Sequence, residues 1–216
     1  MKKVILLGCV IVFSKSLFGQ FEPKHTFNME VGIPVPIANK SFKGIMKGVV
    51  SISPYYQHRF SNSLAFGTGI QYNYIQINPT KVPPSEKAKG GMHSVGVFLK
   101  VSKEKFHDEQ FATDFGVKMG YSQTYFMTDS NEEKYGKPQQ VNSISVAPML
   151  GLILSVDEFS SYRFTLGYTV QGFGFSPQRI GITTNGGYDP SNFSKPTQYL
   201  IVGFGFTHYF HKKSSE

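Results

Sequence analysis

Few residues of this 216-residue chain have the type and spacing that nucleophilic catalysis needs. The single cysteine, Cys9, lies near the N-terminus, and the one adjacent pair of interest is His93 and Ser94, in a segment where apolar and small residues alternate. Neighbouring residues of a β-strand point to opposite faces, and a serine nucleophile needs a base within hydrogen-bond reach. The two side chains would therefore not meet, so the sequence favours a protein without catalytic residues.

Metal-binding patterns are also missing from the sequence. It has no His-x-x-x-His pair and no set of cysteines. The acidic run from Asp129 to Glu133 could bind calcium, but it lacks the spacing and central glycine of an EF-hand loop. We interpret this run as an acidic loop tip, and we expect no metal and no cofactor.

Six charged residues share one feature: each falls among the small and polar positions of an alternating segment. They are Glu30, Arg59, Lys100, Asp114, Lys118 and Arg163. If these positions face the interior of a narrow barrel, an unpaired ion there is costly. We therefore predict an internal salt-bridge network in which two carboxylates are shared among four cations. A structural plug is the simpler interpretation, and a gate or narrow ion path is the alternative.

Eight segments with a period of two would position these side chains. Bulky apolar residues alternate with small or polar ones, and turn residues separate the segments, which cover residues 25–33, 48–60, 64–74, 94–101, 111–122, 144–155, 162–171 and 199–210. Segments of this length cross a membrane as tilted strands. Pro54 and Pro148 interrupt two of them, and each predicts a bulge.

The second face of these segments separates two kinds of barrel. A soluble barrel has a charged exterior, whereas a membrane barrel turns its apolar face to lipid. Here the second face is mostly Gly, Ala, Ser, Thr and Gln, which suits a narrow interior. The fold class is therefore all-β: an eight-stranded antiparallel transmembrane β-barrel.

Loop lengths indicate the orientation. Links of residues 61–63, 102–110 and 157–161 are short, whereas links of residues 34–47, 78–92, 126–142 and 176–196 are long. Membrane barrels have short periplasmic turns and long outer loops. Both termini are therefore expected in the periplasm of a bacterium, and the protein in its outer membrane.

Composition agrees with this class. Aromatic residues make up 15% and charged residues 17% of the chain, and the mean hydropathy is only -0.20. The net charge is +8, but the lysines are scattered without a run of five or more. A nucleic-acid partner is therefore not expected.

The first nineteen residues have the layout of a secretory signal peptide. A cationic start, Met1-Lys2-Lys3, precedes an apolar run over residues 4–13 and a more polar exit. Cys9 interrupts this run instead of ending it, which argues against a lipoprotein cleavage site. We predict a leader over residues 1–19 and a barrel domain over residues 20–216, with no cysteine left for a disulfide.

Residues 200–210, Leu-Ile-Val-Gly-Phe-Gly-Phe-Thr-His-Tyr-Phe, resemble the closing strand of outer-membrane barrels. The resemblance implies that Phe204, Phe206 and Phe210 form a signal for the barrel-assembly machinery. His208 and the tail over residues 211–216 depart from that pattern. Residues 21–210 as a whole resemble the porin-family small barrels of Bacteroidetes, of the OmpA-like or PorT-like group, a resemblance that implies location more than activity.

Apolar residues in the long links allow two interpretations: contact with a partner protein, or loops that fold onto each other and cap the barrel. They are Phe42, Ile45, Met46, Tyr135, Ile180, Ile182, Tyr188 and Phe193. We expect a non-enzymatic accessory or structural subunit of an outer-membrane complex, with outer-membrane lipid and lipopolysaccharide around it. A small passive pore and a lipid A deacylase-like enzyme are the alternatives.

Overall fold

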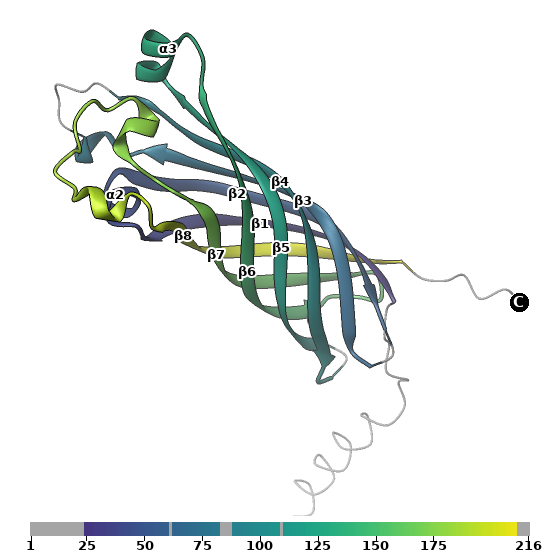
Figure 1. Ribbon diagram of the computed structural model, residues 1–216. Helices are drawn as coiled ribbons and strands as arrows, with labels where there is room; N and C mark the ends of the chain where they lie inside the picture. The colour runs from purple at the N-terminus through teal and green to yellow at the C-terminus, as the bar shows by residue number, and fades with distance from the viewer. Residues whose placement is uncertain (1–23, 61, 83–87, 109, 211–216) are drawn as a thin grey trace, which may run out of the picture.

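The computed structural model describes residues 24–60, 62–82, 88–108 and 110–210 (Figure 1). They form eight antiparallel strands that pair in chain order and close into one barrel, because β8 pairs with β1. The expected eight-stranded antiparallel barrel is confirmed. The predicted leader, Cys9 and the tail over residues 211–216 lie outside the described residues.

The strands are longer than the sequence pattern predicts. They are β1 (His25–Ala38), β2 (Met46–Arg59), β3 (Leu64–Ile77), β4 (Gly90–Phe106), β5 (Phe111–Thr128), β6 (Gln139–Ser155), β7 (Ser160–Gly174) and β8 (Pro196–Phe210). Short helices lie between them: α2 (Lys40–Ile45), η2 (Pro79–Lys81), α3 (Asp129–Tyr135), η4 (Pro177–Ile180) and η5 (Pro190–Asn192).

The two ends of the barrel differ. The short turns β2–β3, β4–β5 and β6–β7, the start of β1 and the end of β8 lie at one end, which we call the turn end. The helices lie at the other, the loop end (Figure 1). Most of the added strand length is at the loop end, where outward positions such as Gln123 and Gln140 are polar and hide the alternation.

The predicted bulges at Pro54 and Pro148 are wrong. Pro54 pairs with Met29 and Pro148 with Val117 in unbroken register. A proline removes one donor, which weakens the pairing on one side of the strand without inserting a residue. The register shifts lie at the loop end instead, between Gly48 and Val50, between Pro36 and Ala38, and between Gln171 and Gly174.

Burial alternates along every strand and confirms the assignment of the two faces. On β4, for example, Val97 is 60% and Leu99 63% exposed, whereas Lys100 is 0% exposed. The outer face is therefore apolar and the interior carries the polar and charged groups, the reverse of a soluble barrel. In the part of the chain that the structure describes, no helix is long and apolar enough to cross a membrane.

Candidate functional site

The charged interior of the barrel is centred on Asp114 of β5. Its carboxylate accepts from Lys100 of β4 at 2.5 Å and from the Arg163 guanidinium of β7, and all three side chains are buried. Lys100 also donates to Gln57 Oε1 at 2.8 Å and to Tyr55 Oη at 3.3 Å. One carboxylate thus binds two cations that come from either side of β5, from β4 and from β7.

A second ion pair joins Glu30 of β1 to Lys118 of β5. Lys118 Nζ lies 2.7 Å from Glu30 Oε2, and the Tyr55 hydroxyl donates to Glu30 Oε1 at 2.7 Å. The ammonium group also lies 5.0 Å from the ring centre of Tyr55 and 4.8 Å from that of Phe98, within the range of a cation–π contact. Tyr55 therefore links the two ion pairs.

Glu104 of β4 is a third buried carboxylate that sequence reasoning missed. It accepts from Gln57 Nε2 at 2.6 Å and lies 3.8 Å from the Arg163 guanidinium. The predicted strand ended at residue 101, five residues before the end of β4 at Phe106. Continued alternation from Lys100 through Ser102 to Glu104 was the signal that could have identified it.

Strand register brings like charges together on one wall. Lys100 lies directly opposite Lys118, and Glu104 lies directly opposite Asp114. Like charges directly opposite each other destabilise a strand pair. Lys100 and Asp114 pair within the β4–β5 hairpin. The charges that compensate Lys118 and Glu104 come from other strands, since Glu30 lies on β1 and Arg163 on β7.

Glycines make room for these contacts at two positions. Gly67 lies between Gln57 and Lys100 in the register, and a Cβ there would lie 3.5 Å from the Cβ of each. Gly151 lies opposite Asp114, and a Cβ there would lie 3.3 Å from Arg163 Nη1. A larger side chain at either position would push into the charged cluster.

Arg59 is also buried, but it lies apart from the other predicted cations. Its guanidinium lies 4.7 Å from the ring centre of Phe106 at the turn end. Among the described residues, the buried charges are the carboxylates Glu30, Glu104 and Asp114 and the cations Arg59, Lys100, Lys118 and Arg163.

Neutral polar side chains fill the interior between the charged cluster and the loop end. Thr124 donates to Ser94 Oγ at 3.1 Å and Gln171 to the same atom at 3.3 Å, while Asn73 donates to the Tyr199 hydroxyl at 3.3 Å. His93 points to the outer face instead, where its Nδ1 lies 2.9 Å from the Tyr72 hydroxyl. His93 and Ser94 therefore do not form a catalytic pair.

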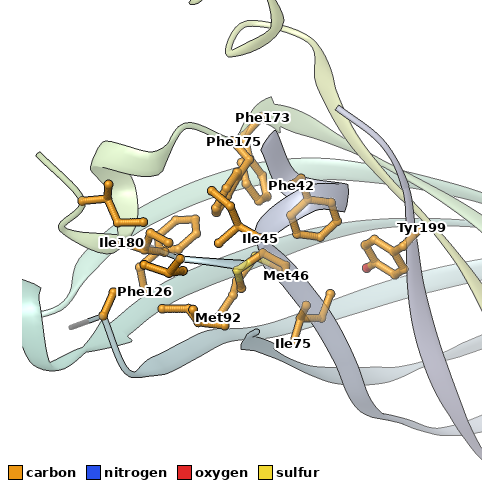
Figure 2. Close-up of a cluster of buried hydrophobic side chains, with 14 residues drawn as sticks. Phe42, Ile45, Met46, Ile75, Met92, Phe126, Phe173, Phe175, Ile180 and Tyr199 are labelled. Atoms are coloured by element: carbon orange, nitrogen blue, oxygen red, sulfur yellow. The ribbon is translucent and has the colours of Figure 1, made fainter. Parts of the chain in front are cut away.

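The loop end of the barrel is filled by apolar side chains, which we call the apolar cap (Figure 2). Phe42 and Ile45 of α2 lie in one cluster with Phe126 of β5, Phe173 of β7 and Phe175, which follows β7 (Figure 2). The cap comprises Phe42, Ile45, Met46, Ile75, Ile77, Val82, Ala88, Met92, Phe126, Phe173, Phe175, Ile180, Ile182 and Tyr199. The Phe42 and Phe175 rings meet edge to face with their centres 5.4 Å apart.

Asn39 positions α2 over the barrel mouth. Its φ of 63° turns the chain inward, and its side-chain oxygen accepts from the backbone N–H of Phe42 at 3.2 Å. Its amide group donates to the carbonyl oxygens of Phe175 at 3.2 Å and Lys195 at 3.0 Å. One side chain thus ties the β1–β2 and β7–β8 loops together.

The apolar cap bears on the two interpretations of the apolar loop residues, partner contact or loops that cap the barrel. Phe42, Ile45, Met46, Ile180 and Ile182 are all buried within it. The interpretation that the loops fold onto each other therefore holds for these five side chains, and they offer no outer contact surface.

Three other apolar loop residues lie outside the cap proper. Tyr188 is half-buried and packs against it, and Phe193 is half-buried. Tyr135, at the end of α3, is 46% exposed. The Lys134 ammonium lies 5.2 Å from the centre of the Tyr135 ring. Tyr135 is thus the one of the eight predicted contact residues that faces mainly outward.

The acidic run over residues 129–133 forms helix α3 rather than a loop tip. Thr128 caps the helix by accepting from the Asn131 backbone N–H at 3.2 Å, and Asp129 and Glu132 lie in the first turn, where acidic groups favour a helix. A cavity of about 340 Å³ lies between the end of β5, α3 and residues 136–138, which link α3 to β6. Within the described ranges, no cluster of three or more His, Cys, Asp or Glu could hold a metal ion.

The predicted closing-strand residues Phe204, Phe206 and Phe210 all lie on the outer face and are exposed. Their strand, β8, joins β1 over a long register that runs from His25 opposite Phe210 to Ala38 opposite Gln198. This strand pair closes the barrel.

Comparison with known proteins identifies the fold but not a family. No protein-family description matches the sequence, and no curated protein matches it. The structure is similar to that of Neisserial surface protein A, with a TM-score of 0.53 at 12% identity over 86% of this chain and 97% of that protein. It is also similar to the outer membrane protein OprG of Pseudomonas aeruginosa, with a TM-score of 0.50 at 13% identity over 89% and 99%.

These likenesses identify a small outer-membrane-type β-barrel fold. The expected outer-membrane location is that of the known structures with this fold. A Bacteroidetes or PorT-like affiliation finds no support in these comparisons.

Proposed function

We propose that this protein is a non-enzymatic bacterial outer-membrane barrel with a plugged interior and periplasmic termini, which acts through the surface it presents outside. The apolar outer face supports the membrane part of the proposal. On β1 the outward residues from Phe27 to Val35 are all exposed, and at about 3.3 Å per residue and a tilt of about 40° they span roughly 20 Å along the membrane normal. The apolar band of known membrane barrels is about 25 Å tall.

The observation that carries the plugged interior is its double closure. In the half nearer the turn end, Glu30 of β1 and Lys118 of β5 join opposite walls beside the Lys100–Asp114–Arg163 cluster, and the apolar cap fills the loop end. An ion crossing the first layer would have to break buried ion pairs, and in the second it would lose its water to apolar side chains that cannot replace it. Eight strands enclose an interior that side chains can fill.

Conductance in planar bilayers tests the plug. We expect the purified barrel to insert, judged by heat-dependent migration on a gel, and to give no stable open-channel current. The positive control is a variant in which both closures are removed. It carries Asp114→Ala and Arg163→Ala, and Gly and Ser replace residues 40–45 of α2; its conductance should be higher. Stable channels from the unmodified protein would overturn the proposal.

A role as an accessory subunit has one specific supporting feature. The β5–β6 hairpin is long, with 18 residues in β5 and 17 in β6, and it carries α3 and the exposed Tyr135 at its tip. Figure 1 places this tip at the loop end, away from α2. An exposed aromatic next to a cation is a common protein contact element.

Co-purification in mild detergent tests the subunit role. We expect another outer-membrane protein to accompany the barrel, and we expect Tyr135→Ala to weaken that association, while Tyr162→Ala, an exposed tyrosine near the turn end, leaves it unchanged. A barrel that purifies alone from native membranes would count against the subunit role without affecting the plug.

The remaining partners of the proposal are lipid and the assembly machinery. Phe204, Phe206 and Phe210 of β8 are exposed on the outer face. In this proposal they contact lipid, and the assembly machinery recognises them as the end of the closing strand. We expect Phe210→Ala to lower the amount of heat-modifiable barrel in the outer membrane, with Phe115→Ala on β5 as the matched lipid-facing control. Unchanged lipopolysaccharide masses with and without the protein would support the absence of enzymatic activity.

A further inference from the structure

Two histidines face each other on the outer wall at the turn end. His25 of β1 and His58 of β2 are directly opposite in the strand register. Their Nδ1 atoms lie 3.2 Å apart, and their rings are tilted at 51° with centres 4.5 Å apart. The rings therefore meet through their nitrogen atoms.

A phenol lies beside this pair. The Tyr56 hydroxyl, also on the outer face of β2, contacts His25 Nδ1, so this nitrogen has two polar neighbours, the phenol and His58 Nδ1. His25 is exposed and His58 is half-buried. The His58 ring packs edge to face on Phe60 with centres 4.7 Å apart, which restricts its orientation.

A hydrogen bond between the two nitrogens leaves one polar contact of His25 Nδ1 unmade. A neutral imidazole has one N–H and one bare nitrogen, so a direct Nδ1 to Nδ1 hydrogen bond requires one histidine in each tautomer. His25 Nδ1 can then serve either His58 or Tyr56 as a donor, but not both. A metal ion would instead accept both nitrogen lone pairs at once.

The separation fits such an ion. Two imidazole nitrogens on one tetrahedral Zn²⁺, each about 2.0–2.1 Å from the metal, lie about 3.3 Å apart. The observed separation is 3.2 Å. Imidazole ligands suit zinc and copper, and copper binds more tightly to a given set of such ligands.

We propose that His25 and His58 form a binding site for one divalent transition-metal ion, Zn²⁺ or Cu²⁺, with water completing the coordination. Each histidine coordinates through Nδ1, and the Tyr56 hydroxyl, which contacts His25 Nδ1, gives up that contact to the ion. Because the site joins β1 to β2, the bound ion links two neighbouring strands next to the β1–β8 closure.

Metal titration of the full-length barrel in detergent, prepared without a polyhistidine tag, tests this site. We expect one Cu²⁺ per chain with a paramagnetic resonance spectrum that shows two nitrogen ligands, and one Zn²⁺ by calorimetry. His25→Ala and His58→Ala should each weaken binding at least tenfold. Tyr56→Phe should not weaken binding, because the hydroxyl competes with the ion for His25 Nδ1.

His208→Ala is the matched control. His208 lies on the outer face of β8 near the same end, but its ring packs against Phe210 and lies outside the His25–His58 pair. Binding should be unchanged in this variant. Equal loss of binding in His208→Ala and His58→Ala, or no binding by the unmodified protein at millimolar metal, would overturn the proposal; heat-dependent migration confirms that each variant is folded.

Discussion

The interior of this barrel is filled in two chemically opposite ways. Near the turn end, buried charges pair across the barrel around Asp114, whereas the loop end is filled by the apolar cap around Phe42 and Phe175. The charged region is built mainly from strand residues, and strand register determines their positions along the barrel axis. The cap depends on α2 and the loops, which must fold inward before it exists.

The difference teaches how each region depends on closure of the barrel. Register places like charges side by side on β4 and β5, so pairing in the charged region is complete only when β1 supplies Glu30 for Lys118 and β7 supplies Arg163 for Asp114 and Glu104. The cap instead depends on burial of apolar area, which is non-directional. Single substitutions should therefore damage the charged region through lost pairing and the cap through lost packing.

Asp114→Asn should have the largest effect. It keeps the shape of the side chain but leaves Lys100 and Arg163 buried beside a neutral group. Breaking a buried ion pair by removing one partner costs about 3–5 kcal/mol, and we expect that loss in the free energy of unfolding in lipid vesicles. Glu158→Gln, in an exposed turn, should change it little. Similar losses for both would mean that burial does not govern the charged region.

Ile45→Ala should have the next largest effect, through the cap. Ile45 is buried between α2 and the barrel mouth, and such truncations cost about 3 kcal/mol. The same unfolding measurement should show a much smaller loss for Ile144→Ala, since Ile144 lies on the outer face and is 68% exposed. If Ile45→Ala were neutral, the cap would not contribute to stability.

Asn39→Ala should have a moderate effect. It removes the helix cap and the two bonds to Phe175 and Lys195, at a backbone conformation that alanine disfavours, which costs about 1–2 kcal/mol. Asn39→Gly relieves the backbone strain, so its smaller loss isolates the side-chain bonds. Equal stability of all three proteins would show that Asn39 does not position α2.

Acid should have the smallest effect, confined to the loop that covers the cap. The backbone N–H of Ser191, which donates to Asp189 at 2.9 Å, lowers the pKa of that carboxyl. A lowered pKa means that the interaction is present above the unfolded-state pKa and is lost as the pH falls through the folded one.

Amide exchange of Ser191 by nuclear magnetic resonance, corrected for the intrinsic rate, measures this effect. We expect its protection to decrease between about pH 5 and pH 3, and Asp189→Asn to remove the pH dependence. Loss of protection in the strands over the same range would place the acid-sensitive groups inside the barrel instead.

Sequence periodicity predicted the strands because every second residue must meet a different environment. It failed at the loop end, where polar outward residues such as Gln140 erase the contrast between the faces. The bulges assigned to Pro54 and Pro148 were wrong because a missing donor need not change the register.

Side-chain partners were harder to predict than strand positions. Alternation places Lys100 and Asp114 on the same face, but their contact depends on the stagger between β4 and β5, which lets a long side chain reach four residues along the neighbouring strand. Whether Phe42 and Ile45 are buried or exposed could not be predicted either, because an apolar loop residue has the same sequence signature in a cap and in an exposed contact.

The unequal strand lengths give the barrel an oblique rim, with the β5–β6 hairpin as its tallest wall. Its tip ends in Gly136, where an added Cβ would touch nothing within 4 Å. A foreign peptide inserted beside Gly136 would therefore extend away from the wall. The barrel could then serve as a scaffold that displays the peptide without contact to the barrel rim.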